Sequence, residues 1–426
     1  MRFDSLDGWL HWQEQLHPTE IELGLDRVRE VLFSLGLGSP AAPVITVAGT
    51  NGKGSTVAYL ESILSEAGYR VGAYSSPHLL RYNERIRIGR AEVNDRDLCA
   101  AFDAVDRARG KTSLTYFEFG TLAALWLFHR QEVEILVLEV GLGGRLDAVN
   151  VLDPKVAILT SIGIDHSNWL GSDREEIGRE KAGIFRSASP AICADIDPPD
   201  SVLARAMALG TDLSLIGEDF KYQVEGKIWN WESKGLKYSE LPLPLMAGEH
   251  QLRNASAALR ALNLLADELT VTRDHVVAGL QIATLPGRLQ CMGEGPQYIL
   301  DVAHNEQAIS YLCQVLANTP CMGSTHVILG LLADKDANQV IAQLVPVADH
   351  WCFVGLPTER AMDVDRLHEA LGLLGQKGET FAGVEQALAA TVARVSTQDR
   401  ILITGSFFTV AEGMRVLSSN GVDEFK

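Results

Sequence analysis

The sequence lacks the features that mark secreted or membrane-spanning proteins. Its six cysteines are scattered along 426 residues without a Cys-x-x-Cys pair or a metal-ligand spacing, so we expect reduced thiols and no disulfide framework. Residues 1–7 do not have the pattern of a signal peptide, and no apolar run approaches the length of a membrane span. These absences predict a soluble, cytoplasmic protein.

An excess of positive charge is also lacking. The formal net charge is −18 at pH 7, which argues against nucleic acid or an anionic membrane as a partner. An anionic substrate would have to be held by locally placed cations and metal, because the overall field repels it. The composition, with 46% hydrophobic and 22% charged residues, is that of a globular protein, and the length predicts two domains.

A glycine-rich stretch carries the clearest functional signal. An apolar, β-branched run at 44–48 leads into a glycine-rich turn, after which Val57, Leu60 and Leu64 recur at helical spacing. A strand, a glycine turn and a helix N-terminus in this order direct backbone N–H groups and the helix dipole at an anion. The expected phosphate-binding residues are Gly49, Thr50, Asn51, Gly52, Lys53, Gly54, Ser55 and Thr56.

The match to the usual phosphate-loop spacing is imperfect. That spacing needs a glycine where this chain has Val47 and a hydroxyl residue where it has Gly54. A tight strand-to-helix turn without a ligand is the alternative interpretation. Because the strand and the helix are indicated on both sides of the turn, we predict a nucleoside-triphosphate site of an unusual subtype.

Polar residues follow the ends of further predicted strands, where open α/β sheets bind ligands. Ser76 follows the strand at 70–74, although its hydroxyl could equally make a turn before a proline. His166 follows the strand at 156–161, and a role as a ligand or as a surface or satisfied core histidine is equally compatible with this position. Both residues are therefore candidates only.

Glu139 ends an apolar strand at 135–140 that the sequence predicts to be buried on both faces. A carboxylate there would be costly to bury without a partner. An ion pair with Arg145 is one solution, but a hard cation near the phosphate loop is the favoured one.

Two predicted helices contain further candidates whose ordinary interpretation is structural. The helix at 173–185 is strongly charged, which by itself indicates a solvated face that would include Lys181. The helix at 115–129 begins with aromatic residues, and aromatics at helical spacing are usually core. A substrate-stacking role for Phe117 is therefore the minority interpretation from periodicity alone.

Strands alternate with helices along most of the chain, which predicts a mainly parallel, doubly wound sheet. The Pro-Gly pair at 286–287 lies between two periodic regions, and the alternation restarts beyond it. We therefore predict an α/β protein with a P-loop ATPase-like domain at 1–286 and a smaller Rossmann-like domain at 287–426. In the second domain, strands are predicted at 298–302, 326–330, 351–354 and 401–404. Polar clusters lie at the ends of the first and the last of them, at 301–305 and 405–406.

Eight motifs in matching order resemble those of the folylpolyglutamate synthases, a family within the ATP-dependent Mur ligase superfamily. They are the 49–55 loop, SSPHL at 75–79, LEVGLGGRLD at 138–147, DH at 165–166, REKAGIF at 179–185, HQ at 250–251 with Asn254, LPGR at 285–288 and DVAHN at 301–305. The resemblance covers nearly the whole chain. The stretch 114–119 is particularly similar to the bacterial members that combine dihydrofolate synthase and folylpolyglutamate synthase activities.

The resemblance implies a role for each matching residue. ATP would be bound by the loop and by Asn254, Arg288 and Asp301, the last through the ribose. Magnesium, with two ions expected, would be held by Ser76, Glu139, His166 and a carbamylated Lys181. The pterin site would be lined by Thr115, Phe117, Asp147 and Ala148, and His304 and Ser406 would orient glutamate or nucleotide. The residues expected to act in catalysis are Lys53, Lys181, His166 and Arg288.

The implied reaction is acyl activation followed by amide formation. ATP phosphorylates the carboxylate of dihydropteroate, or the γ-carboxylate of a folate, and the amine of L-glutamate then displaces phosphate. Domain closure about residues 286–287 would bring the three substrates together and exclude water. We expect a monomer whose partners are these small molecules, with no nucleic acid and no membrane.

Alternative functions make different predictions. A folylpolyglutamate synthase without dihydrofolate synthase activity would share these eight motifs. A Mur ligase acting on cell-wall precursors usually carries an additional N-terminal domain, for which about 40 residues before the loop leave no room. A nucleotide-gated switch protein would hydrolyse ATP slowly, without stimulation by folate or glutamate.

Overall fold

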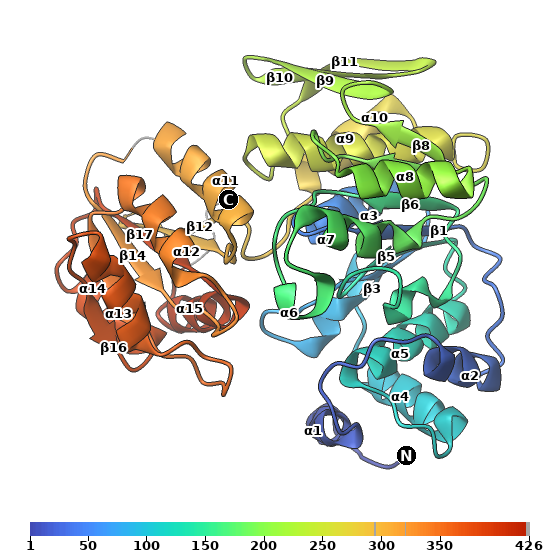
Figure 1. Ribbon diagram of the computed structural model, residues 1–426, viewed down its shortest axis with the longest axis horizontal. Helices are drawn as coiled ribbons and strands as arrows, with labels where there is room; N and C mark the ends of the chain where they lie inside the picture. Colours follow the sequence, from blue (N-terminus) through green and yellow to red (C-terminus); the bar gives the residue numbers. More distant parts are fainter. Residues whose placement is uncertain (294, 320, 423–426) are drawn as a thin grey trace. The chain divides into compact units, whose positions relative to one another are not determined.

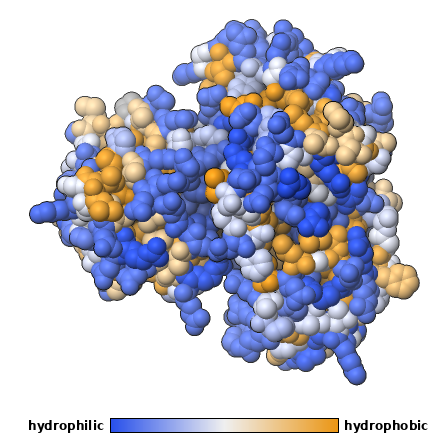
Figure 2. All heavy atoms as spheres, viewed as in Figure 1, coloured by the Kyte–Doolittle hydropathy of each residue, from blue (hydrophilic) through white to orange (hydrophobic). Residues whose placement is uncertain are grey.

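The computed structural model describes residues 1–293, 295–319 and 321–422. It divides into two compact units: Met1–Gly163, Ser167–Leu245 and Gln251–Thr284 form the first, and Ile164–His166, Met246–His250 and Leu285–Lys426 form the second. Within the described part of the chain, no helix is both long enough and apolar enough to cross a membrane. On the face drawn in Figure 2, hydrophilic residues predominate and apolar ones lie in separate groups.

The first unit is built on an eight-stranded sheet with the order β4-β3-β2-β5-β1-β6-β7-β8 (Figure 1). The six strands from β2 to β8 run parallel, whereas β3 and β4 add an antiparallel edge. The strands are β1 Val44–Ala48, β2 Val71–Tyr74, β3 Ile86–Ile88, β4 Ala91–Glu92, β5 Ile135–Glu139, β6 Val156–Leu159, β7 Pro190–Cys193 and β8 Asp212–Leu215. Every residue of β1 and β5 is buried, as their continuous apolar runs predict for central parallel strands.

Helices lie before, between and after these strands. They are α1 Leu6–Leu16, α2 Asp26–Ser34, α3 Lys53–Glu66, α4 Asp95–Arg109, α5 Tyr116–Arg130, α6 Ser167–Leu170, α7 Arg174–Lys181, α8 Asp200–Leu209, α9 Glu249–Leu264 and α10 Arg273–Ile282, with short 3₁₀ turns at Tyr82–Arg85, Ala148–Val151 and Ala182–Ile184. Helix α3 packs closely against α10, because Gly279 has no side chain: a Cβ there would lie 2.6 Å from the Cα of Ile63. The helix that follows the phosphate loop is thereby fixed on the sheet.

A separate antiparallel sheet of three strands lies beside α10 in Figure 1. Its strands are β9 Phe220–Glu225, β10 Ile228–Ser233 and β11 Leu236–Pro242. The side chains of Trp229 and Trp231 are fully buried under it.

The second unit contains a six-stranded sheet with the order β12-β13-β17-β14-β15-β16, in which only β12 is antiparallel. Its strands are β12 Gln290–Met292, β13 Gln297–Asp301, β14 Thr325–Leu329, β15 His350–Val354, β16 Glu379–Phe381 and β17 Arg400–Thr404. Its helices are α11 Glu306–Asn318, α12 Ala337–Leu344, α13 Val364–Leu373, α14 Val384–Val392 and α15 Phe407–Ser419, with a 3₁₀ turn at Val345–Val347.

The predicted α/β class, with a doubly wound and mainly parallel sheet followed by a smaller Rossmann-like sheet, is confirmed. The four strands predicted in the second unit correspond to β13, β14, β15 and β17. The two strands that were not predicted, β12 and β16, have three residues each and lie at the sheet edges. So short a strand carries little periodic signal.

Candidate functional site

The phosphate loop joins β1 to α3 in a conformation that requires glycine. Gly49 and Gly52 have φ angles of 150° and 90°, which L side chains rarely adopt. A Cβ at Gly52 would also lie 2.3 Å from the Oδ1 atom of Asn254, and one at Gly49 would lie 1.9 Å from Oγ1 of Thr160. The loop therefore has the close backbone approaches that a cradle for phosphate needs.

Two lysines converge on this loop. The ammonium group of Lys53 donates to the carbonyl oxygens of Gly49 and Thr50 at 3.0 and 3.1 Å, and that of Lys181 donates to the same Gly49 oxygen at 2.9 Å. Lys181 is only 4% exposed, so it is not part of a solvated face, although it ends a charged helix. Gly144 allows this placement, because a Cβ at Gly144 would lie 2.8 Å from the Lys181 carbonyl oxygen.

Helix α9 reaches the start of α3. The side chain of Gln251 donates to Oγ of Ser55 at 3.2 Å, and the predicted residue Asn254 donates to Oε1 of Gln251 at 3.1 Å. All three side chains are buried. Gln251 lies in a motif that the sequence singles out, but its contact with Ser55 depends on how α9 lies on the sheet.

Ser76 and Glu139 are brought together at the carboxyl ends of β2 and β5. The backbone N–H of Ser76 donates to Oε2 of Glu139 at 3.2 Å. Glu139 is 4% exposed and pairs in register with Val47, at the end of β1 just before the phosphate loop. The guanidinium of Arg145, the alternative partner considered for Glu139, forms an ion pair with Glu180 at 2.9 Å. A buried carboxylate beside a phosphate cradle is a suitable ligand for a hard divalent cation.

The residues predicted for the pterin meet around the segment that follows β5. The Phe117 ring lies 5.8 Å from the Tyr74 ring. A Cβ at Gly141 would lie 2.6 Å from Cζ of Phe117. Thr115 caps α5 by accepting from the N–H of Glu118 at 3.2 Å. Ala148, also assigned to this group, is buried.

Asp147 supplies the carboxyl of this group, and its pKa is raised. Burial raises its pKa to about 7, although hydrogen bonds from the N–H groups of Leu142, Val149 and Gly141 and the charge of Lys53 oppose that rise. The bonds from the N–H groups of Leu142 and Val149 measure 2.9 and 3.0 Å. A carboxyl that changes protonation near neutral pH within a candidate site is consistent with a functional role.

Sequence reasoning assigned no role to an ionic cluster beside α5. Arg27 donates to Glu118 at 2.9 Å and also pairs with Glu22. His17 contacts Glu22 and Ser113, each at 2.8 Å. Arg27 and Glu118 are 91 positions apart and His17 and Ser113 are 96 positions apart, so local spacing carries no signal for these two contacts.

In the second unit, Asp301 ends β13 and is buried. It accepts hydrogen bonds from the N–H groups of Leu289 and Ala303, both at 2.8 Å. Burial raises its pKa, and the nearby charge of Arg288 opposes that rise. The Arg288 guanidinium lies over the Phe407 ring, 5.4 Å from its centroid.

Ser406 and His304 also lie at strand ends of this unit. Ser406 is 2% exposed and caps α15, where its Oγ accepts from the N–H of Thr409 at 3.0 Å. The His304 ring contacts the carbonyl oxygen of Val302 through Nδ1 at 2.7 Å and the carboxylate of Asp165 through Nε2 at 3.4 Å.

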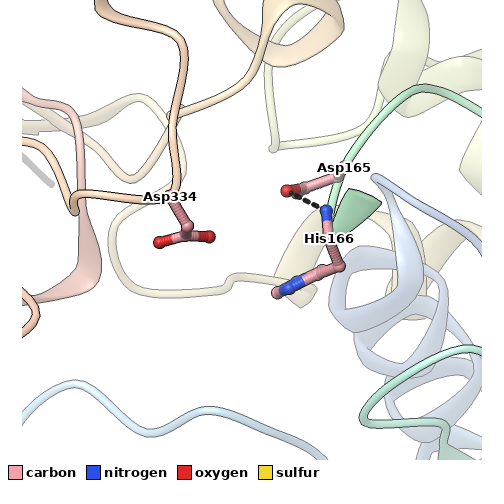
Figure 3. A group of neighbouring side chains, drawn as sticks. All are labelled: Asp165, His166 and Asp334. Carbon is pink, nitrogen blue, oxygen red and sulfur yellow. Dashed lines mark hydrogen bonds between the residues drawn. The ribbon is translucent and has the colours of Figure 1, made fainter. Parts of the chain in front are cut away.

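His166 belongs to the three-residue segment of the second unit. Its ring and the carboxylates of Asp165 and Asp334 offer ligand atoms that lie within 4.8 Å of one another. Figure 3 shows the side chains of Asp165 and His166 directed toward the side on which Asp334 lies. These three residues resemble a metal centre, but a protein cation already lies among them.

That cation is Lys335. Its ammonium group lies 2.5 Å from Asp165 and 3.1 Å from Asp334, and its side chain is 7% exposed. Burial tends to raise the pKa of Asp165, but His304, His166 and Lys335 outweigh it and hold this pKa far below its usual value. Lys335 therefore pairs with both carboxylates and offsets part of their charge. Sequence reasoning missed Lys335, although it lies in a polar run beyond a strand end, which is the signal used for His166.

Two family models match the chain. The Mur ligase middle domain matches residues 47–262, and the Mur ligase, glutamate ligase domain matches residues 287–407. The dihydrofolate synthase/folylpolyglutamate synthase of Escherichia coli (strain K12) is 44% identical over 414 residues, which cover 97% of this chain and 96% of that protein. The protein of the same name from Haemophilus influenzae is 38% identical and covers 96% of each chain.

Solved structures agree with this relationship. E. coli FolC in complex with DHPP and ADP has a TM-score of 0.93 at 44% identity, covering 98% of this chain and 99% of that one. A bifunctional folylpolyglutamate synthase/dihydrofolate synthase with Mn, AMPPNP and L-glutamate bound has a TM-score of 0.91 at 43% identity, covering 97% and 98%. The resemblance drawn from the motifs is confirmed, and the chain belongs to the dihydrofolate synthase/folylpolyglutamate synthase family of the Mur ligases.

Proposed function

We propose that this chain is an ATP-dependent ligase that joins L-glutamate to dihydropteroate, forming dihydrofolate, and to the γ-carboxylate of folates, forming folylpolyglutamates. The observation that carries the proposal is the convergence of Lys53 and Lys181 on the Gly49 carbonyl oxygen within a glycine-rich phosphate loop. The relatives give the substrate class, since their solved structures hold DHPP, ADP, AMPPNP and L-glutamate.

In this proposal, the amides of residues 49–56 and the Lys53 ammonium bind the ATP phosphates. Asn254 supports the loop from α9, and Arg288 of the second unit contacts the phosphates during transfer. Asp301 accepts from the ribose. Positive charge at these points lowers the barrier by offsetting the repulsion between an anionic carboxylate and an anionic phosphate.

The pterin substrate would lie against Phe117, with Thr115, Asp147 and Ala148 beside it. Its carboxylate attacks the γ-phosphorus of ATP, and ADP leaves, which produces an acyl phosphate. The amine of glutamate, oriented by His304 and Ser406, then attacks the acyl carbon, loses a proton and expels phosphate. The products are the amide, ADP and phosphate.

Magnesium is the proposed cofactor, with two ions expected. Ser76, Glu139 and His166 would provide ligands for one ion, and a carbamate on Lys181 would serve the second. The buried Glu139 carboxylate fits such a role, as described above. When bound, magnesium would neutralise charge on the phosphates. Bound Mn in the structure of one relative supports the use of a divalent cation by this family.

The test is a phosphate-release assay with ATP, magnesium and glutamate that compares dihydropteroate with tetrahydrofolate. The proposal predicts near-absolute dependence on glutamate and on a pterin substrate, with both pterins active. Activity with tetrahydrofolate alone would indicate a folylpolyglutamate synthase only. Slow ATP hydrolysis that neither substrate stimulates would indicate a switch protein and overturn the proposal.

We further propose that the protein acts as a monomer in the cytoplasm. All six of its cysteines are free thiols in the structure, which suits a reducing compartment. Sedimentation at assay concentrations would test the oligomeric state.

A further inference from the structure

Arg87 joins three elements around the start of the 75–79 loop. Its guanidinium contacts both carboxylate oxygens of Glu61 at distances from 2.8 to 3.2 Å. The same group donates to Oγ of Ser75 at 3.0 Å and to the carbonyl oxygen of Glu84 at 2.9 Å. Arg87 thus connects the helix that follows the phosphate loop to the loop that carries Ser76.

The ion pair lies in an unusual position. The side chains of Arg87 and Glu61 are 16% and 6% exposed, and burying two charges is costly even when they pair. Glu61 faces inward from α3, two turns after Lys53. Replacing a buried ion pair with apolar residues of similar volume is often neutral or stabilising, so the pair is weak evidence for a stabilising role and indicates a role that apolar side chains cannot fill. Donation to Ser75 is such a role.

Ser75 is fixed at two points. Its N–H donates to the carbonyl oxygen of Arg85 at 2.9 Å, and its side chain accepts from Arg87. The next residue, Ser76, donates its N–H to Glu139. The direction of the Ser76 amide and hydroxyl therefore depends on how Ser75 is held. Ser75 alone therefore lies between the Arg87 guanidinium and the proposed metal ligands Ser76 and Glu139.

The other end of the same loop is held by Glu84. Its carboxylate accepts from the N–H groups of Leu79 and Leu80, each at 2.7 Å, and of Arg81 at 2.6 Å. Three consecutive amides on one carboxylate leave the chain from Leu79 to Arg81 little freedom. At the remaining end, the contact with Arg87 is the one that holds the side chain of Ser75.

We propose that Arg87 is a positioning residue, which acts through Ser75 to hold Ser76 in the orientation needed for the divalent cation. This inference rests on the proposed function, because it takes Ser76 and Glu139 as metal ligands. Arginine is required because one planar group must reach Glu61 and Ser75 together, which a lysine ammonium cannot do with the same geometry.

The experiment compares Ser75→Ala and Arg87→Lys with the unchanged protein. Ser75→Ala removes a single hydroxyl, and Arg87→Lys keeps the charge beside Glu61. Mn²⁺ binding is followed by electron paramagnetic resonance without nucleotide, and the Mg²⁺ concentration for half-maximal phosphate release is measured in parallel. We expect Mn²⁺ to bind about tenfold more weakly in both variants, with the Mg²⁺ requirement raised and kcat at saturating Mg²⁺ largely kept.

The control is Arg109→Lys. Arg109 is a similarly buried arginine of the same unit, bonded to Asp106 and to the carbonyl oxygen of Thr112. A merely structural role for Arg87 would lower the melting temperature in Arg87→Lys and in Arg109→Lys alike and leave Mn²⁺ affinity unchanged in both. That outcome would overturn the inference.

Glu139→Gln distinguishes the proposed metal site from the positioning role of Arg87. If it weakens Mn²⁺ binding while Ser75→Ala does not, the metal role of Glu139 stands and the positioning role of Arg87 is wrong. If Glu139→Gln binds Mn²⁺ as tightly as the unchanged protein does, the proposed metal site is wrong, and the positioning role of Arg87 is wrong with it. Ser75→Ala decides the matter even if Arg87→Lys does not fold.

Discussion

Lys53 and Lys181 donate to one and the same backbone oxygen, that of Gly49, at 3.0 and 2.9 Å. Two ammonium groups this close repel each other, so an anion between or beside them is favoured. One of the two, Lys181, is buried, and burying two like charges close together is expensive. Conversion of Lys181 to the proposed carbamate would remove this repulsion and leave Lys53 as the cation for the ATP phosphates.

Lys53→Ala should abolish ligation with either pterin substrate. Removing a charged contact with phosphate in a closed site should cost roughly a thousandfold in rate. Two hydrogen bonds of Lys53 go to the carbonyl oxygens of its own loop, and we expect the fold to stay intact in the variant. Phosphate release and thermal melts measure the two effects, and a variant that keeps a tenth of the activity would contradict the phosphate role.

Lys181 should carry a carbamate. A free ammonium group would repel magnesium, whereas a carbamate is an anionic oxygen ligand that suits it. Lys181→Ala and Lys181→Arg should both be nearly inactive, and formate or acetate should restore part of the alanine variant's rate. Carbon-13 labelling or mass measurement of the native protein detects the group. An unmodified lysine together with an active arginine variant would show that the prediction is wrong.

Glu139→Gln should weaken magnesium binding without unfolding the protein. The amide keeps the shape of the side chain and can still accept from the N–H of Ser76, but it lacks the charge that a hard cation prefers. The Mg²⁺ concentration for half-maximal activity should rise about tenfold or more. A lower melting temperature with an unchanged magnesium requirement would point to a purely structural carboxylate.

Asp147 should make stability depend on pH. Its folded pKa of about 7 exceeds the ordinary value of 3.8 because of burial. The folded state therefore holds the proton more tightly, and this contribution is present below about pH 4 and lost as the pH rises through about 7. Asp147→Asn has no such proton.

The measurement is the difference in melting temperature between the unchanged protein and Asp147→Asn at a series of pH values. It should shift in favour of the variant between about pH 5 and about pH 8. A constant difference across this range would mean that Asp147 titrates at its usual pKa. Lys53→Ala should raise the pKa of Asp147 further, because the Lys53 charge lowers it.

Gly141→Ala should impair the pterin site selectively. The added Cβ would lie 2.6 Å from the Phe117 ring, so the ring must move. We expect KM for both pterin substrates to rise by about tenfold, which corresponds to roughly 1.4 kcal/mol, while KM for ATP stays unchanged. Gly372→Ala is the matched control, because no atom lies within 4 Å of its added Cβ. Equal effects of both variants would remove Phe117 from the pterin site.

Local features of the sequence determined much of this protein. The glycine turn at 49–52, the apolar runs of β1 and β5 and the carboxylate at the end of β5 depend on neighbours a few positions away. Backbone preference and periodicity act at that range. The phosphate loop, the alternation of strands and helices along the chain and the α/β class follow from them. The motif resemblance then led to the family.

Only the tertiary structure decided which distant residues meet. Lys181 ends a charged helix and contacts a carbonyl oxygen 132 positions away, and Lys335 pairs with Asp165 across 170 positions. Arg87 reaches Glu61 and Ser75 only because β3 pairs with β2 beside α3. Such contacts depend on strand order and on helix packing over the whole chain, and the free energy that selects them comes from burying a shared core, which no short stretch encodes.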